Sequence, residues 1–221
     1  MSYATRVLHK LGPFSVSQSF PQLLREWYAT GIMEDVEEPV EECDVCGHEH
    51  IRYLFQIKNL KNGNVRDKSG SKCILKFDEI GVRFEGRIVY DPTEKQKALD
   101  EFLKEYRARL RKEFARQVWV GLQGKDAAPA PIAIMRDICV RIYNTPEENG
   151  LLTPKQFAMF VWAAKIVEIT IRLTPFQGVM NLRKGKSKDQ LAGLHPRQIE
   201  DIKGALTPPQ LAILERERGG P

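Results

Sequence analysis

The fold is decided by two short stretches, Cys43-Asp-Val-Cys46-Gly-His48-Glu-His50 and Gly70-Ser71-Lys72-Cys73-Ile74-Leu75-Lys76-Phe77. A Cys-x2-Cys pair followed by glycine is typical of a zinc knuckle. The two residues between the thiolates form a tight turn, and nearby backbone N–H groups can hydrogen-bond the sulfurs. Cys73 is predicted to open a helix, where the helix dipole favours a thiolate. The pattern therefore predicts a structural Zn²⁺ site.

Structural zinc takes four ligands, so three cysteines require one more. His50, four residues past Cys46, has room to turn back onto the ion. His48 is the alternative, although its position directly after glycine constrains it. Cys139 is a remote candidate inside an apolar segment, which is typical of a core cysteine. The predicted ligand set is Cys43, Cys46, His50 and Cys73, and the competing interpretation is a small core of unliganded thiols.

A β-hairpin is predicted between the knuckle and Cys73. Residues 51–59 alternate as a strand, and Asn62-Gly63 is the signal of a type I′ turn. The return strand around Val65 is short and polar. A further strand is predicted at 84–91.

Knuckle, hairpin and a ligand at a helix start follow one another in the order of a treble-clef zinc finger. Residues 43–77 resemble the small treble-clef-type fingers found in uncharacterised proteins of phages and other mobile elements. In those proteins Cys-x2-Cys-Gly is followed by an aromatic strand, a turn and Gly-Ser-x-Cys-Ile-x-x-Phe, which Ile51-Arg52-Tyr53 and residues 70–77 match here. Many treble clefs carry a second cysteine pair at the helix, whereas this chain has Cys73 alone. The resemblance implies a fold and a broad role in nucleic-acid or protein binding, and it implies no activity.

Helical patterns flank this segment. A helix is predicted at 20–30, capped by Ser19, and an acidic loop follows at 34–42. A long helix from Thr93 to about Leu122 carries an apolar stripe at three- and four-residue steps. Residues 124–131 have linker composition, and another apolar helix is predicted at 132–143.

Four copies of Leu-[Thr/His]-Pro-x-Gln begin at Leu152, Leu173, Leu194 and Leu206. Each is a helix-start device, because threonine caps the helix, proline fits its first position and glutamine completes a capping box. We therefore predict an α+β protein in four parts: a helix and acidic loop (1–42), a treble-clef-like zinc-bound hairpin unit with a long basic helix (43–123), a linker (124–131) and a mostly α-helical domain (132–221).

The composition of the chain limits the classes of protein to which it can belong. The chain has 221 residues, a net charge of +5 and 42% hydrophobic residues, enough for a packed core. It has no apolar run long enough to span a membrane and no signal-peptide stretch, and its four unevenly spaced cysteines do not form a secreted disulfide pattern. We expect a cytoplasmic protein without a membrane or small-molecule partner.

Two basic clusters are predicted to contact phosphate, with a merely solvated surface as the alternative. The predicted nucleic-acid-binding residues are Lys104, Arg107, Arg109 and Arg111 on the long helix, and Arg183, Lys184, Lys186 and Lys188 in a basic loop. These clusters favour a non-enzymatic zinc-finger protein that binds DNA or RNA.

The alternative is a zinc-stabilised protein-interaction module that docks on a larger assembly, with Trp27, Trp119 and Trp162 as possible anchors. A metal-dependent nuclease would need histidines on both the hairpin and the helix. The sequence has none between His50 and His195, so catalysis is not expected.

Overall fold

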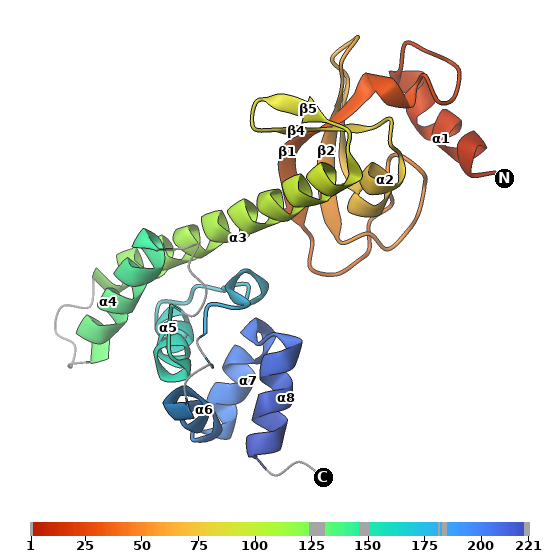
Figure 1. Ribbon diagram of the computed structural model, residues 1–221. Coiled ribbons are helices and arrows are strands. Elements are labelled where there is room, and N and C mark those ends of the chain that lie inside the picture. The colour runs from red at the N-terminus through yellow and green to blue at the C-terminus, as the bar shows by residue number, and fades with distance from the viewer. Residues whose placement is uncertain (1, 124–130, 146–150, 181, 183–184, 219–221) are drawn as a thin grey trace. The chain divides into compact units, whose positions relative to one another are not determined.

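The computed structural model describes residues 2–123, 131–145, 151–180, 182 and 185–218 (Figure 1). The chain forms two compact units, Met1–Tyr106 and Arg107–Pro221. The first contains one five-stranded sheet and the C-terminal region is helical, so the predicted α+β class is confirmed. None of the described helices is long and apolar enough to cross a membrane.

The sheet of the first unit has the strand order β3-β2-β1-β4-β5. The middle strand β1 (Trp27–Asp35) pairs antiparallel with β2 and parallel with β4. The others are β2 (Tyr53–Asn59), β3 (Val65–Gly70), β4 (Gly81–Phe84) and β5 (Arg87–Val89). Because β1 is the first strand of the chain, both of its neighbours come from later in the sequence.

The predicted helix at 20–30 is wrong. Turns lead into a short 3-10 helix at Leu24–Glu26, and Trp27 then begins β1. Trp27 is fully buried, and its indole Nε1 donates to Ser15 Oγ at 2.9 Å. Aromatic and β-branched residues suit a pleated, buried surface, so tertiary burial outweighed the local capping signals. The acidic stretch correspondingly begins inside β1, where Asp35 is buried.

The β2–β3 hairpin is confirmed, although its turn differs from the predicted type. Of Asn62 and Gly63 only the glycine has positive φ, whereas a type I′ turn needs positive φ at both central residues. That combination occurs instead at Glu85 (φ 49°) and Gly86 (φ 79°), which link β4 to β5. The predicted strand at 84–91 is therefore interrupted by a tight turn.

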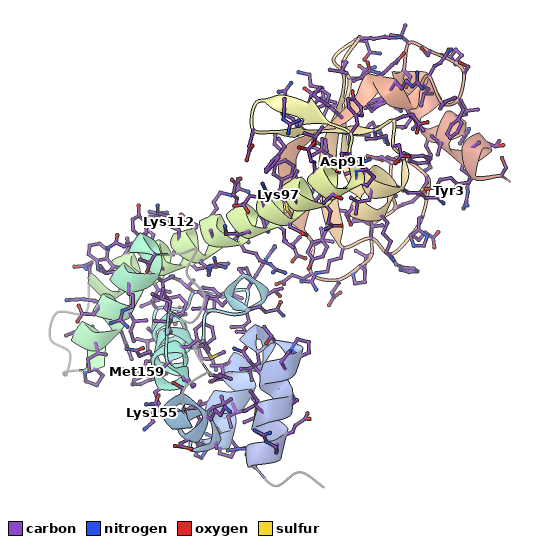
Figure 2. All side chains as sticks on the ribbon, viewed as in Figure 1. Tyr3, Asp91, Lys97, Lys112, Lys155 and Met159 are labelled. Atoms are coloured by element: carbon purple, nitrogen blue, oxygen red, sulfur yellow. The ribbon has the colours of Figure 1, made fainter. Side chains whose placement is uncertain are left out.

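The first helices of the chain complete this unit. α1 (Tyr3–Leu11) buries Val7 and Leu11, and α2 (Ser71–Lys76) follows β3 without a loop. The predicted long helix is confirmed as α3 (Pro92–Gln123), and Figure 2 labels Asp91 at its start. The carboxylate of Asp91 accepts hydrogen bonds from the N–H groups of Thr93 and Glu94, both at 3.0 Å. The division between the two units falls inside α3, and the predicted linker lies outside the described residues except for Pro131.

The second unit is built from helices α4 (Pro131–Asn144), α5 (Pro154–Ile166), α6 (Gly185–Ala192), α7 (Pro196–Ile202) and α8 (Pro208–Glu217). Its core includes Phe157, Phe160 and Phe176, whose ring centroids lie 5.3–6.2 Å apart. Capping boxes open α5, α7 and α8 as predicted. The remaining copy of the motif opens only a 3-10 turn at Thr174–Phe176.

Candidate metal centre

The knuckle lies in the loop between β1 and β2. Residues 44–46 form a turn that is closed by a hydrogen bond from the N–H of Gly47 to the carbonyl of Cys43, at 2.8 Å. The N–H of Cys43 in turn bonds to the carbonyl of His48 at 2.9 Å. Gly47 has φ 68°, a left-handed conformation that glycine adopts without strain. The turn therefore aims both cysteine side chains to one side.

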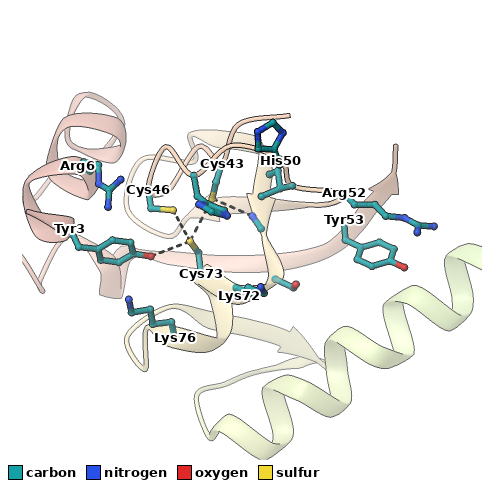
Figure 3. A pocket seen from close by; sticks show the side chains of 14 residues that line it. Tyr3, Arg6, Cys43, Cys46, His50, Arg52, Tyr53, Lys72, Cys73 and Lys76 are labelled. Carbon is teal, nitrogen blue, oxygen red and sulfur yellow. Dashed lines mark hydrogen bonds between the residues drawn. The ribbon is translucent and has the colours of Figure 1, made fainter. Parts of the chain in front are cut away.

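Cys73 lies beside the two knuckle sulfurs, although it comes from the far end of the β2–β3 hairpin. It lies in the first turn of α2, so β3 and the helix start deliver it as predicted. Its Sγ lies 3.0 Å from Cys46 Sγ and 3.6 Å from Cys43 Sγ (Figure 3). Of the described residues, these three buried cysteines are the one group whose donor atoms could together hold a metal ion, all within 4.8 Å of one another.

The sulfur geometry fits a tetrahedral ion. Zinc–sulfur bonds of about 2.3 Å place neighbouring sulfurs about 3.8 Å apart, so the two distances from Cys73 Sγ need to widen by less than about 1 Å. Three thiolates also suit a soft or borderline ion such as zinc more than magnesium or calcium.

Backbone N–H groups support the sulfurs as a knuckle requires. Gly70 N–H donates to Cys43 Sγ at 3.3 Å. Hydrogen bonds from Cys43 and Cys73, together with the N–H of His48, lower the pKa of Cys46 despite its burial. Hydrogen bonds with Cys43 and Cys46, and then burial, raise the pKa of Cys73. The cluster thus favours thiolate character first at Cys46, and a divalent ion would extend it to all three sulfurs.

A residue that the sequence analysis missed also touches the cluster. The phenol oxygen of Tyr3, the first residue of α1, lies 3.3 Å from Cys73 Sγ. Burial and the hydrogen bond to Cys73 raise the pKa of Tyr3. Without a metal the phenol therefore stays protonated and can donate a hydrogen bond to a thiolate. No spacing rule connects Tyr3 to the knuckle, because only the packing of α1 brings it there.

The predicted fourth ligand, His50, is not part of the cluster. Its side chain is 77% exposed, and its Nδ1 lies 3.1 Å from the carbonyl oxygen of Pro39. His50 also has φ 62°, which turns the chain sharply before Ile51. His48 is likewise exposed and outside the group of three cysteines. Cys139 is buried in the core of the second unit, as expected for a packing cysteine.

A pocket of about 440 Å³ opens over the sulfurs (Figure 3). Its lining is basic and aromatic, with Arg6, Lys72 and Lys76 beside Tyr3 and Tyr53, and it contains no aspartate or glutamate. Arg52 also lines it, but this guanidinium is held by the buried carboxylate of Asp35 through two hydrogen bonds, at 2.7 and 2.9 Å. The pocket therefore presents positive charge next to the candidate metal site.

The predicted phosphate contacts on α3 do not share one environment. Lys104 is exposed and pairs with Glu101 at 3.0 Å, Arg109 is exposed, and Arg107 is partly buried. Arg111 is 6% exposed and donates a hydrogen bond to the carbonyl of Pro175. Because this guanidinium is buried in the second unit and hydrogen-bonded there, Arg111 is not part of a phosphate-binding surface.

The second basic cluster is described only in part. Arg183 and Lys184 lie outside the described residues, as does the side chain of Lys186. Lys188 lies half-buried on α6, so the predicted basic loop is wrong from Gly185 onward, where the chain is helical.

Fold and site together define an α+β protein with a cluster of three thiols that could hold a metal ion, under a basic pocket. No family model, curated protein or solved structure matches this chain.

Proposed function

We propose that this chain is a non-enzymatic nucleic-acid-binding protein whose N-terminal unit is stapled by Zn²⁺ in a treble-clef-like arrangement. Cys43, Cys46 and Cys73 would hold the ion. The observation that carries the proposal is the pocket beside these thiols, because its lining combines the cations Arg6, Lys72 and Lys76 with aromatic rings and lacks carboxylates. Cationic grooves with exposed rings bind single strands, since phosphates meet the charges and bases stack on the rings.

The phosphate-binding group in this proposal is Arg6, Lys72 and Lys76. All three side chains are exposed, and none of the ion pairs among the described residues involves them. Tyr53, at the start of β2, is the ring for base stacking. Lys104, Arg107 and Arg109 on α3 form a second, separate set of possible contacts.

Salt-dependent binding tests this assignment. Fluorescence anisotropy would follow labelled single- and double-stranded oligonucleotides across a salt series, with the wild type and the triple variant Arg6→Glu/Lys72→Glu/Lys76→Glu. Losing three contacts to a single strand reduces the slope of log affinity against log salt by about 2. We expect that reduction together with an affinity loss of more than tenfold.

A matched variant separates the two basic sets. Lys104→Glu/Arg107→Glu/Arg109→Glu carries the same change in charge on α3. If only this variant loses binding, the phosphate surface lies on α3 instead of at the pocket. Wild-type protein that binds no oligonucleotide, or binds it without salt dependence, contradicts the nucleic-acid proposal altogether.

A second candidate function is a protein-interaction module, favoured by a mostly apolar pocket of about 290 Å³ in the second unit. Trp119 and Tyr143 line it and are 38% and 41% exposed, while Trp27 is buried and excluded as an anchor. Lys112, labelled in Figure 2, adds positive charge to this surface, because its Nζ lies 4.8 Å from the centre of the Tyr143 ring, whereas Arg116 is paired with Glu113. The fitting partner is therefore an apolar segment with an acidic neighbour. Trp119→Ala should abolish such binding and leave oligonucleotide affinity unchanged.

A further inference from the structure

The proposed metal centre has three sulfur ligands, whereas tetrahedral zinc takes four donors. The oxygen of Tyr3 lies 3.3 Å from Cys73 Sγ. With zinc–sulfur and zinc–oxygen bonds of about 2.3 and 2.0 Å, neighbouring sulfur and oxygen ligands stand about 3.5 Å apart. The phenol oxygen thus lies close to the separation from Cys73 Sγ that two ligands of one tetrahedral ion would have. We propose that Tyr3 is this ligand, binding as a phenolate, an inference that rests on the proposed metal centre.

Packing fixes the ring of Tyr3 at this place. It stacks on Phe77, with ring centroids 5.4 Å apart and an interplanar angle of 26°. Phe77 directly follows α2, the helix that carries Cys73, so ligand and ring partner belong to the same short segment. On the other side, α1 is anchored by the buried side chains of Val7 and Leu11. Moving the phenol away from the sulfurs would break these contacts.

The charges around the ring also suit an anionic ligand set. A divalent ion bound by three thiolates and one phenolate forms a centre with a net charge of −2. Lys76 Nζ lies 4.0 Å from the centre of the Tyr3 ring, and the guanidinium carbon of Arg6 lies 5.6 Å from it. These cations offset the excess negative charge, as outer groups do at metal sites. Binding would release the remaining thiol protons and the phenol proton to solvent, since the ion favours the deprotonated ligands.

The histidines predicted from the sequence are less well placed. The ring of His50 faces the carbonyl of Pro39, and its side chain is 77% exposed. To reach the ion, His50 would have to leave that contact, whereas Tyr3 already touches a sulfur ligand.

Cobalt substitution of the full chain tests the ligand directly. Co²⁺ reports its donor set through its visible spectrum, and phenolate formation appears in the ultraviolet difference spectrum during titration. The variants are Tyr3→Phe, which keeps the stacked ring and removes only the oxygen, Tyr3→His, His48→Ala and His50→Ala. We expect Tyr3→Phe to lose the phenolate signal, alter the cobalt spectrum and weaken metal binding by about 100-fold. Tyr3→His should recover tight binding with a changed spectrum.

The outcomes distinguish the assignment of Tyr3 as a ligand from the proposed metal centre itself. One ion per wild-type chain with no phenolate signal, or a Tyr3→Phe protein whose cobalt spectrum and affinity equal those of the wild type, overturns the assignment of Tyr3 and leaves the metal centre standing. Loss of binding in His48→Ala or His50→Ala alone also overturns it. Wild-type protein that binds neither Co²⁺ nor Zn²⁺ overturns the metal centre itself. Should Tyr3→Phe fail to fold by circular dichroism, the phenolate signal of the wild type still decides.

Discussion

The backbone N–H of Gly70 donates to Cys43 Sγ at 3.3 Å, which ties the end of β3 to the first sulfur of the knuckle. A Cβ added at Gly70 would lie 3.8 Å from the same sulfur and 3.3 Å from Ile51 Cγ2. The residue thus combines a donor that supports a thiolate with a surface that allows the sulfur to approach closely. This single position couples the sheet to the candidate metal site.

Replacing Gly70 should separate these two roles. Gly70→Ala keeps the N–H and has an allowed φ of −71°, so we expect metal affinity to fall by less than about tenfold. Gly70→Pro removes the donor at a φ that proline tolerates, and we expect a loss of about 10- to 100-fold. Competition with a metal-binding dye measures both affinities. Equal losses in the two variants would mean that the N–H···S bond contributes nothing.

Removing the metal should unfold residues 43–77 and spare the second unit. Binding of an ion supplies folding free energy to a segment whose own apolar core is small. Hydrogen exchange before and after chelation would show lost protection in the knuckle, β2, β3 and α2, with α5 unchanged. Cys43→Ser should behave as the chelated wild type. Near-native circular dichroism and unchanged thermal stability after chelation would contradict this prediction.

Glu26 should make the first unit sensitive to acid. Burial by itself would raise the pKa of Glu26, but hydrogen bonds from Ser17, Asn59 and Lys61 and from the N–H of Val16 outweigh it and lower the pKa to about 2. The carboxylate is 1% exposed. Since the folded pKa is depressed, its stabilisation is present above the unfolded pKa of about 4.3 and is lost as pH falls through the folded pKa. The shift corresponds to about 3 kcal/mol of unfolding free energy at neutral pH.

Chemical denaturation of the wild type and Glu26→Gln across a pH series checks this. The wild type should be more stable at neutral pH, and the difference should shrink below about pH 4. Both proteins are compared at the same metal occupancy, which is followed alongside, because acid also displaces metal from thiolates. A difference that does not change with pH would show that the charge of Glu26 is not what stabilises the unit.

Arg111 should matter for stability and not for nucleic-acid binding. Its buried guanidinium donates to the carbonyl of Pro175, so Arg111→Met leaves a buried acceptor without its donor. We expect a loss of about 1–3 kcal/mol in the unfolding free energy of the second unit and an unchanged salt slope for oligonucleotide binding. The exposed neighbour provides the control, since Arg109→Met should change stability by less than about 0.5 kcal/mol. If Arg111→Met reduced the slope of log oligonucleotide affinity against log salt, Arg111 would contact phosphate after all.

Three helix starts and the β2–β3 hairpin were predictable because their signals lie within a few residues. Thr153, His195 and Thr207 cap helices through hydrogen bonds to the next turn, and Gln156, Gln198 and Gln210 complete the boxes. The same motif at Thr174 opens only a 3-10 turn, which shows that a cap does not determine helix length. The convergence of Cys43, Cys46 and Cys73 was also predictable, because a knuckle, a hairpin and a helix start follow directly along the chain.

The central strand could not be predicted, because its stability comes from partners far along the chain. Residues 27–35 carry helix-start signals just before them, yet they form β1 because β2 and β4 pair with both of its edges. The same holds for Arg111, whose place on an amphipathic helix gave no sign that the carbonyl of Pro175 would cover it.

The grouping of the three thiols, the hairpin that separates them, the long helix and three capped helix starts could be predicted from the sequence alone. Each depends on turn chemistry, periodicity or capping that acts over a few residues. Only the tertiary structure decided the strand order, the direction of His50 and the contact of Tyr3 with Cys73. These depend on which surfaces bury one another, and burial is a property of residues brought together by the whole fold.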